Sequence, residues 1–389
     1  MKEKYCKIPK FRFNKFLESW KRLKYEDVIE VNSGKDYKHL EKGDIPVYGT
    51  GGYMLSVSEA ITNKDGVGIG RKGTINKPYI LKAPYWTVDT LFFCIPKNKY
   101  NLYFINAIFE RTQWERFDES TGVPSLSKLT INNIQNYFPS FDEQSAIGSL
   151  FRTLDDLLSS YKNNLANYQS LKTTMLSKMF PKAGQSVPEI RLDGFEGEWK
   201  FIRLGKVLLE AYQGINTTSD KVEYSVSGIP ILQAKHITNG QINYKDTRYL
   251  DMDIYEHYIS KYMPKKGEIL FANIGTIGPS VLVDTDEMFL IAWNILKMSI
   301  KDNYSPVFIK ITLSLLDSKH IFERITTGNA TKFINKDEIM DIRISVPSLP
   351  EQQAIGTYFS NLDNLINSYQ EKISQLETLK KKLLQDMFI

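Results

Sequence analysis

The chain has 389 residues, of which 42% are hydrophobic and 24% charged, and its formal net charge is +5. This is an ordinary globular composition, long enough for two or more domains, and no apolar run reaches the roughly 20 residues that cross a bilayer. The first residues lack the apolar core of a signal peptide, and two cysteines, Cys6 and Cys94, form neither a disulfide framework nor a metal cluster. We therefore expect a cytoplasmic protein with reduced thiols, no membrane contact and no bound metal.

The positive charge is concentrated in the first part of the chain. Residues 1–138 carry 22 basic and 15 acidic side chains, whereas residues 181–346 carry 20 and 21. Only the first of these segments could attract a polyanion through its average field. Net charge is therefore a weak indication of nucleic-acid binding here.

Residues 1–138 predict a first globular domain of mixed α/β type. Strand-like runs stand at residues 43–48, 78–86 and 90–96, and a helical pattern covers residues 101–117. Within this domain Gly68, Gly70 and Gly73 form the spacing G-x-G-x-x-G. A dinucleotide-binding fingerprint requires a helix after the glycines, but the residues that follow, "TINKPYIL", favour a turn into another strand. We expect the glycines to shape this turn and to let the backbone approach a neighbour closely.

Residues 139–180 predict a long helix with a seven-residue apolar repeat. The repeat recurs in residues 347–389, where 18 of 42 positions aligned at an offset of 208 are identical. The first row of apolar positions comprises Ile147, Leu154, Tyr161, Tyr168 and Met175 in one helix and Ile355, Leu362, Tyr369, Leu376 and Leu383 in the other. Each helix could pack only on its own domain, but sustained heptads favour pairing of the two helices. Because each helix follows a globular segment, such a coiled coil would be antiparallel.

Residues 181–187 form a linker, and residues 188–346 predict a second globular domain related to the first. The openers "PKFRFNKFLESWK" at Pro9 and "PEIRLDGFEGEWK" at Pro188 share five residues at an offset of 179. Strand-like runs stand at residues 228–233, 267–275, 279–284 and 288–300, and a helical pattern covers residues 305–325. The molecule is therefore expected to be two copies of one α/β unit, with a pseudo-twofold relation between them.

Catalytic signatures are missing from both copies. The sequence contains no G-x-x-x-x-G-K-[ST], no G-x-S-x-G and no Asn-Pro-Pro-aromatic motif, and its four histidines lack metal-ligand spacing. Glu198-Trp199-Lys200 has acidic-x-Lys spacing, but the tryptophan and lysine belong to the repeated opener. We expect no catalytic residue in this chain, although an unrecognised active site stays open.

Polar, aromatic and glycine-rich loops recur at matching places in both copies and suit DNA contact. Arg and Lys can read guanine edges, Gln and Asn adenine edges, and hydroxyls can position phosphates. Taken singly, each residue is more often an ordinary turn residue. The candidates are Tyr48, Thr50, Gly51, Gly52, Tyr53, Arg71, Lys72, Thr74, Ser125 and Lys128 in the first copy and Gln233, Lys235, His236, Asn273, Thr276, Asn329 and Lys332 in the second.

These features together resemble one known family, the specificity subunits of type I restriction-modification systems. The resemblance rests on "P-S-x-x-E-Q-x-A-I-G" at Pro139 and Pro347, on the F-x-x-x-W openers, and on the G-x-I-P and G-T turns. It implies two target recognition domains, each reading one half of a bipartite, asymmetric site in double-stranded DNA, with the helices setting the spacer. It also implies docking of two methyltransferase subunits and of restriction/translocase subunits, which would carry S-adenosylmethionine, ATP and Mg²⁺.

Two other classes of function remain open from the sequence. One is a coiled-coil protein-interaction scaffold without DNA recognition. The other is a nuclease or methyltransferase with an unrecognised site of its own. The near-neutral second domain argues against strong DNA binding by the isolated chain, because phosphate contacts dominate such affinity.

Overall fold

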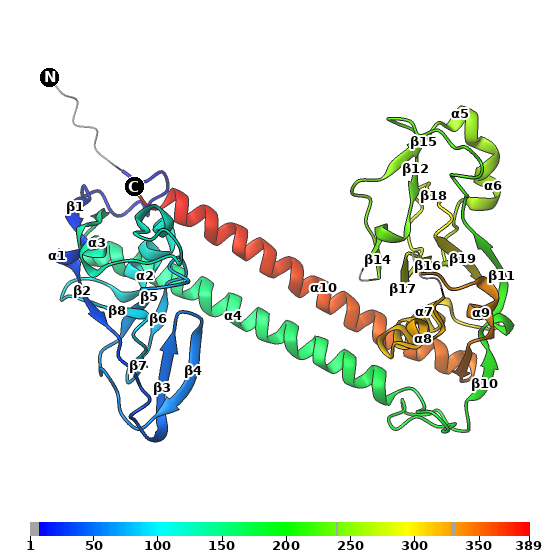
Figure 1. Ribbon diagram of the computed structural model, residues 1–389, viewed down its shortest axis with the longest axis horizontal. Coiled ribbons are helices and arrows are strands. Elements are labelled where there is room, and N and C mark those ends of the chain that lie inside the picture. Colours follow the sequence, from blue (N-terminus) through cyan, green and yellow to red (C-terminus); the bar gives the residue numbers. More distant parts are fainter. Residues whose placement is uncertain (1–7, 239, 328–331) are drawn as a thin grey trace. The chain divides into compact units, whose positions relative to one another are not determined.

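The structure is a computed structural model, and it describes residues 8–238, 240–327 and 332–389. The chain forms two compact units: unit 1 is Met1–Leu165 with Ser368–Ile389, and unit 2 is Ala166–Asn367. Each unit combines one globular α/β segment with part of two long helices, α4 (Phe141–Lys178) and α10 (Leu349–Asp386) (Figure 1). The expected mixed α/β class with two globular segments and two long helices is confirmed.

Unit 1 contains a four-stranded antiparallel sheet, a three-stranded sheet and a strand pair. The four-stranded sheet has the order β2-β8-β5-β6, and the strands are β2 (Ile29–Ser33), β8 (Leu91–Pro96), β5 (Gly66–Gly70) and β6 (Tyr79–Leu81). The three-stranded sheet has the order β4-β3-β7, from β4 (Gly52–Val57), β3 (Lys42–Gly49) and β7 (Trp86–Thr87). The pair is β1 (Lys21–Lys24) with β9 (Gln135–Phe138). The helices are α1 (Tyr25–Val28), α2 (Leu102–Arg111), η1 (Trp114–Phe117) and α3 (Lys128–Asn133).

Unit 2 repeats this plan and adds to it. Its four-stranded sheet is β11 (Leu208–Gln213), β19 (Ile295–Ile300), β16 (Ile269–Ile274) and β17 (Thr276–Leu282). Its three-stranded sheet is β15 (Arg248–Leu250), β12 (Ile229–Leu232) and β18 (Leu290–Ile291), and its strand pair is β10 (Lys200–Arg203) with β20 (Arg343–Val346). The helices are η2 (Leu204–Lys206), η3 (Ala234–His236), α7 (Pro306–Ser318), α8 (Ile321–Ile325) and α9 (Lys336–Asp341). The additions are β13 (Ile237–Thr238), β14 (Gln241–Ile242), α5 (Met252–Tyr255), η4 (Glu256–Tyr258) and α6 (Ile259–Tyr262).

The two units have the same strand order, sheet by sheet. In the three-stranded sheets the central strand also pairs in parallel with the last one: Val47 faces Trp86 in unit 1, and Ile231 faces Leu290 in unit 2. Parallel neighbouring strands need a long crossover connection. Two unrelated folds would therefore rarely share a parallel pair at the same place in the sheet. The structure therefore shows the internal duplication that the sequence predicts.

The repeated Glu-Gln at the start of each long helix has a structural role. The Glu143 carboxylate is buried and accepts two hydrogen bonds of 2.7 Å from the Arg12 guanidinium. In unit 2 the buried Glu351 accepts bonds of 2.8 and 2.7 Å from Arg191. Such bidentate pairs fix geometry as well as energy. The arginine of each opener therefore ties the opener to the start of the long helix.

The glutamine of the same motif links the long helix to the preceding one. Gln144 accepts from the Asn101 backbone N–H at 3.1 Å, and Asn101 is the N-cap of α2. Gln352 accepts from the backbone N–H of Ser305, the N-cap of α7, at 2.9 Å. The glycine that ends the motif lets the helices approach, since a Cβ on Gly148 would lie 2.4 Å from the Asn101 side-chain oxygen. The repeated Glu-Gln motif, on which the family resemblance rests, thus holds the long helix against its domain.

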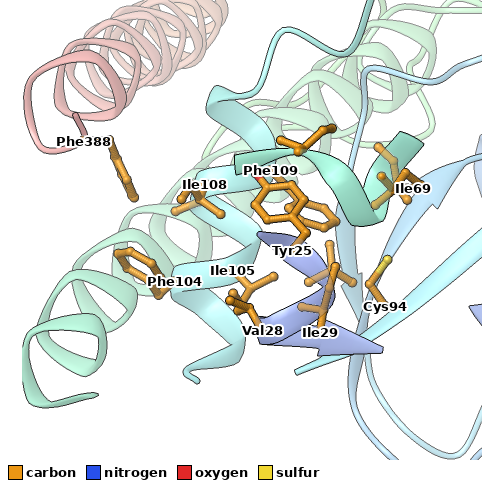
Figure 2. Close-up of a cluster of buried hydrophobic side chains, with 14 of the residues drawn as sticks. Tyr25, Val28, Ile29, Ile69, Cys94, Phe104, Ile105, Ile108, Phe109 and Phe388 are labelled. Carbon is orange, nitrogen blue, oxygen red and sulfur yellow. The ribbon is translucent and has the colours of Figure 1, made fainter. Parts of the chain in front are cut away.

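Each core receives the end of the long helix that begins in the other copy. Figure 2 shows Phe388, next to the last residue of the chain, beside Phe104 in the core of unit 1, and its ring centroid lies 5.4 Å from that of Phe104. In unit 2 Phe180, just past the end of α4, stacks on Phe308 at 5.5 Å. Both phenylalanines are at most 4% exposed, so their burial stabilises each unit by about 1.5–3 kcal/mol per ring.

Segments of α4 and α10 lie together within each unit. In unit 1 the Lys380 ammonium bonds Asp155 at 2.5 Å, and Lys162 bonds Glu377 at 2.6 Å. As residue numbers rise along α4 they fall along α10, so these segments run antiparallel. In unit 2 Lys172 of α4 pairs with Asp363 of α10. Knobs-into-holes packing along the whole length, and with it the coiled coil, stays a prediction.

The G-x-G-x-x-G spacing belongs to a sheet. Gly68 and Gly70 lie in β5, and the next element of regular structure is the antiparallel neighbour β6. Gly73 has φ +89°, a conformation that favours glycine. A Cβ on Gly70 would lie 2.0 Å from the carbonyl oxygen of Thr74. The turn into a second strand is as predicted, and the close neighbour is the chain itself.

Candidate nucleic-acid interface

In unit 1 the candidate segments meet at a turn formed by Val88, Asp89 and Thr90, here called corner turn 1. The Val88 N–H donates to the Tyr48 carbonyl at 3.0 Å, and the Arg71 N–H donates to the Thr90 carbonyl at 2.8 Å. The turn therefore joins the β3 end to the loop after β5, which are far apart in sequence.

Unit 2 forms the same turn from Ala292, Trp293 and Asn294, here called corner turn 2. The Ala292 N–H donates to the Leu232 carbonyl at 2.8 Å, and the Asn273 N–H donates to the Asn294 carbonyl at 3.3 Å. These bonds match those of corner turn 1 one for one. Arg71 therefore corresponds to Asn273, and Asp89 corresponds to Trp293.

The loop after β5 presents cationic side chains to solvent beside corner turn 1, whose own Asp89 is also exposed. Arg71 and Lys72 are both exposed. The Arg71 guanidinium donates to the Asp89 carbonyl at 3.4 Å and lies 5.9 Å from the centre of the Phe92 ring. A guanidinium steadied in this way keeps other N–H groups for a guanine edge or a phosphate. Thr74, two residues further along, is half-buried.

The second candidate loop of unit 1 lies against the first. Lys72 and Ser125 form an isolated β-bridge, and the Gly73 N–H donates to the Pro124 carbonyl at 2.8 Å. Lys128 is exposed and Ser125 half-buried. The Leu126 N–H donates to the Arg71 carbonyl at 2.9 Å, so the structure brings Arg71, Lys72 and Ser125 together, and Lys128 begins α3 three residues after Ser125.

The tyrosines of the β3–β4 hairpin have different surroundings. Tyr53 is 63% exposed, and its hydroxyl pairs with Ser56 at 3.2 Å. Tyr48 is half-buried, and its ring centre lies 6.1 and 6.5 Å from those of Tyr79 and Tyr85. The tight turn between the strands consists of Thr50 and Gly51, and Gly52 begins β4. Tyr53 is therefore the more open of the two rings, and the DNA contact expected for both tyrosines stays a prediction.

Two candidates of unit 2 are buried, which argues against direct base contact. Asn273 is 2% exposed; its amide nitrogen donates to the Ile334 carbonyl at 3.0 Å, and its oxygen accepts from Gln213 at 2.9 Å. His236 is 3% exposed, and its Nδ1 accepts from the Gln233 backbone N–H at 2.8 Å. Burial lowers the pKa of His236, which favours the neutral ring. Both side chains hold loops in place, and their burial leaves no edge accessible to a base.

The remaining candidates of unit 2 differ in exposure. Lys235, Thr276 and Lys332 are exposed, and Gln233 is half-buried. The Gly275 N–H donates to the Lys332 carbonyl at 2.8 Å, so the β16–β17 turn and the segment beginning at Lys332 are neighbours. Asn329 lies outside the described residues.

Sequence reasoning missed a cleft of about 550 Å³ beside corner turn 2. Its lining combines aromatic faces with cations, amides and a carboxylate, and includes Tyr212, Gln213, Asp220, Lys261, Tyr262, Trp293 and Lys336. Trp293 is 37% exposed and Tyr212 38%. Within "MFLIAWNILKMSI" the tryptophan resembles core, and only alignment with Asp89 of the first copy could have marked it as a turn position.

The predicted pairing residues of α4 and α10 occupy several environments. Ile147 and Leu154 are buried in the core of unit 1, where Leu376 and Leu383 pack against them. The rings of Tyr161 and Tyr369 meet at 5.4 Å. The unit 2 core contains Ile355 and Leu362, with Tyr168 and Met175 packed against it. The apolar residues in the first turns of α4 and α10 are thus part of a globular core.

Among residues 8–238, 240–327 and 332–389, no cluster of three or more His, Cys, Asp or Glu side chains could hold a metal ion. Over the same residues, no helix has both the length and the apolar character that crossing a membrane requires. Cys94 is fully buried in the core of unit 1, and burial raises the pKa of its thiol.

Two archaeal proteins have related sequences. The specificity subunit of the type I restriction enzyme MjaVIII from Methanocaldococcus jannaschii is 23% identical over 282 residues, 68% of this chain and 64% of that subunit. The chain thus spans just under two thirds of that relative. The MjaIX specificity subunit of the same organism is 22% identical over 95% of this chain and 93% of its own length.

Solved structures share the fold. The S subunit of a type I restriction-modification system from M. genitalium superimposes with a TM-score of 0.74 at 16% identity, over 98% of this chain and 99% of that one. A chain from a structure on complex assembly and conformational transition of a type I system gives 0.52 at 15% identity, over 96% and 98%. The family model for the type I restriction modification DNA specificity domain matches residues 18–167 and 196–378. With both copies matched over most of their length, this chain belongs to the family of type I restriction-modification DNA specificity proteins.

Proposed function

We propose that this chain is the DNA-binding specificity subunit of a type I restriction-modification complex, in which each globular domain reads one half of a bipartite, asymmetric DNA site. One observation carries the proposal: two domains of the same topology hold their polar loops at the same corner turn with different side chains. Arg71 is exposed at one corner, and Trp293 at the other. Equivalent corners that expose unlike side chains are what two different half-sites require.

In this proposal the long helices set the number of unread base pairs between the half-sites. A helix of 38 residues is about 57 Å long at roughly 1.5 Å per residue, and DNA rises about 3.4 Å per base pair. Spacer length would then follow from protein geometry, as half-site spacing does in dimeric DNA-binding proteins.

The chemistry would reside on partner subunits. Two methyltransferase subunits would dock on this chain and bind S-adenosylmethionine, and restriction/translocase subunits would use ATP and Mg²⁺. The family membership supports this division of labour, in which this chain contributes recognition and assembly but no catalytic group.

The central experiment selects DNA with the assembled complex. The chain with its methyltransferase partner is incubated with random duplexes, and bound fragments are sequenced. We expect two short motifs separated by a fixed unread spacer. Absence of any enriched sequence would support the scaffold reading instead, and methylation by the purified chain alone would refute the non-catalytic assignment.

A second experiment tests the helices as the spacer-setting element. Removing seven residues from α4 and the seven that face them in α10 keeps the heptad rows in phase. The expected spacer is about three base pairs shorter, since seven residues correspond to roughly 10 Å. Removing one heptad from α4 alone is the control, because it leaves the two helices unequal in length, so that Phe180 at the end of α4 no longer reaches its place in the core of unit 2, and it should abolish assembly. Unchanged spacing in the paired deletion would contradict the role.

A further inference from the structure

Trp293 differs from every other tryptophan of the chain. Trp20, Trp86, Trp114 and Trp199 are all 6% exposed or less, and each lies in a core. Trp293 is 37% exposed at the centre of corner turn 2. A large aromatic side chain left open to water forgoes about 1 kcal/mol or more of burial, so its position calls for a reason.

The backbone around Trp293 is held firmly. Its N–H donates to the Ile215 carbonyl at 2.8 Å, and its carbonyl accepts from the Gln213 side chain. The next residue, Asn294, accepts from the Ala234 N–H at 3.2 Å through its side chain. The buried Asn273 in turn bonds Gln213. An amide network therefore fixes the turn that displays the indole.

The surroundings of Trp293 suit nucleic acid. The Lys261 ammonium lies 5.0 Å from the centre of the Tyr262 ring and 5.9 Å from that of Tyr212, and all three line the same cleft as Trp293. Aromatic faces beside a cation can pack on bases or sugars while the cation contacts a phosphate. The same cleft contains half-buried Gln213, whose amide already serves the turn.

The first copy supplies an internal comparison. Where unit 2 has Trp293 and Asn273, unit 1 has Asp89 and Arg71, in a turn with the same backbone hydrogen bonds. The exposed groups at corner 1 are the Arg71 guanidinium, a hydrogen-bond donor, and the Asp89 carboxylate, whereas at corner 2 the exposed group is an indole ring. The two corners therefore favour different base edges: a guanine edge at the first and an apolar thymine methyl edge at the second.

From these observations we propose that Trp293 is a specificity-determining residue of the second domain, packing on base edges of its half-site while Lys261 contacts the adjacent phosphate. This inference rests on the proposed function. It adds the identity of the side chain that discriminates between bases in unit 2. Trp293 was not among the candidates predicted from the sequence.

The test compares three complexes assembled with the methyltransferase partner: wild type, Trp293→Ala and Phe201→Ala. Phe201 is the matched control, an exposed aromatic of the same unit at 63% that lies in β10. Sequencing of bound random DNA should show Trp293→Ala losing discrimination at one or two adjacent positions of one half-site, by about ten-fold each. The other half-site and the Phe201→Ala motif should be unchanged.

A spectroscopic arm reports contact directly. The difference in fluorescence between wild-type and Trp293→Phe complexes isolates this indole, and specific DNA should quench the difference signal while DNA lacking the motif should not. Lys261→Ala should weaken binding to all sequences by a similar factor without changing the motif.

The outcomes separate the inference from the proposed function. A wild-type complex that enriches no motif would overturn the proposed function itself. A bipartite motif that survives intact in Trp293→Ala, with no quenching of the difference signal, would overturn only the role of Trp293. Equal loss of discrimination in both half-sites would also refute it.

Discussion

The Arg12–Glu143 pair offers the sharpest test of how the repeated helix start stabilises each domain. The Glu143 side chain is 1% exposed and that of Arg12 10%, and two bonds of 2.7 Å join them. Arg12 also donates to the Glu18 carbonyl at 2.5 Å. Replacing Arg12 with Met leaves a buried carboxylate without its counter-ion, and this type of change costs about 3–5 kcal/mol.

Urea unfolding followed by circular dichroism and fluorescence measures this cost as a change in the free energy of unfolding. At about 2–4 °C per kcal/mol for a domain of this size, the melting temperature of unit 1 should fall by about 6–20 °C. The matched control is Arg152→Met, because Arg152 pairs with Asp156 at 3.6 Å on an exposed helix face. Arg152 also lies 5.0 Å from the centre of the Tyr103 ring, so that change should cost about 1 kcal/mol or less.

The double variant Arg12→Met/Glu143→Leu separates a lost attraction from an uncompensated charge. Removing both charges should recover much of the stability lost in Arg12→Met, since an apolar pair of similar size fits a buried site. A single variant that costs less than about 1 kcal/mol, or a double variant no more stable than the single one, would refute the reasoning.

Three further predictions concern other parts of the molecule. Arg71→Ala should relax one half-site by about 1–3 kcal/mol in binding free energy, measured by competition with single-base variants, and leave the other half-site intact; equal loss at both would contradict the assignment of Arg71 to one domain. Because burial lowers the pKa of His236 below its ordinary 6.5, the unfolded state binds the proton more tightly, so stability should fall as pH drops from 6.5 toward the folded pKa. Urea midpoints across that range should show the fall, and His236→Asn should reduce it; an equal slope in both proteins would exclude this histidine as the cause. In a Cys6→Ser background, Cys94 should resist alkylation in the folded protein and react fully in urea, because burial raises its thiol pKa. Rapid native labelling would show that the core of unit 1 opens readily.

Local chemistry predicted the long helices and several of the strands. The runs around β3, β8, β12 and β16 were expected as strands, and the helix expected over residues 139–180 is observed at Phe141–Lys178. The runs at residues 78–86 and 288–300 were each expected as one strand, but each contains two strands separated by a turn. Apolar side chains continue through those turns, so hydrophobicity alone does not mark the break.

The candidate site was harder to predict, because exposure depends on residues far away in sequence. Asn273 and Arg71 occupy equivalent backbone positions, yet Gln213 and the Ile334 carbonyl hold Asn273 inside the domain. Asn and Gln are plausible readers of bases in a loop and equally good internal partners. Hydrophobic periodicity cannot distinguish a base-reading amide from an internal hydrogen-bond partner. For the same reason it did not identify Trp293, which lies within an apolar run, as an exposed residue.

The sequence by itself determined the duplication, the two long helices and the family, because repeats and heptads are written in residue order. Only the tertiary structure shows what the repeated Glu-Gln contacts. It also determines which loops meet at the corner turns and which side chains are exposed to solvent. The physical reason is that burial and hydrogen-bond satisfaction are properties of groups brought together by folding. Arg12 and Glu143 stand 131 positions apart and meet only in the folded domain.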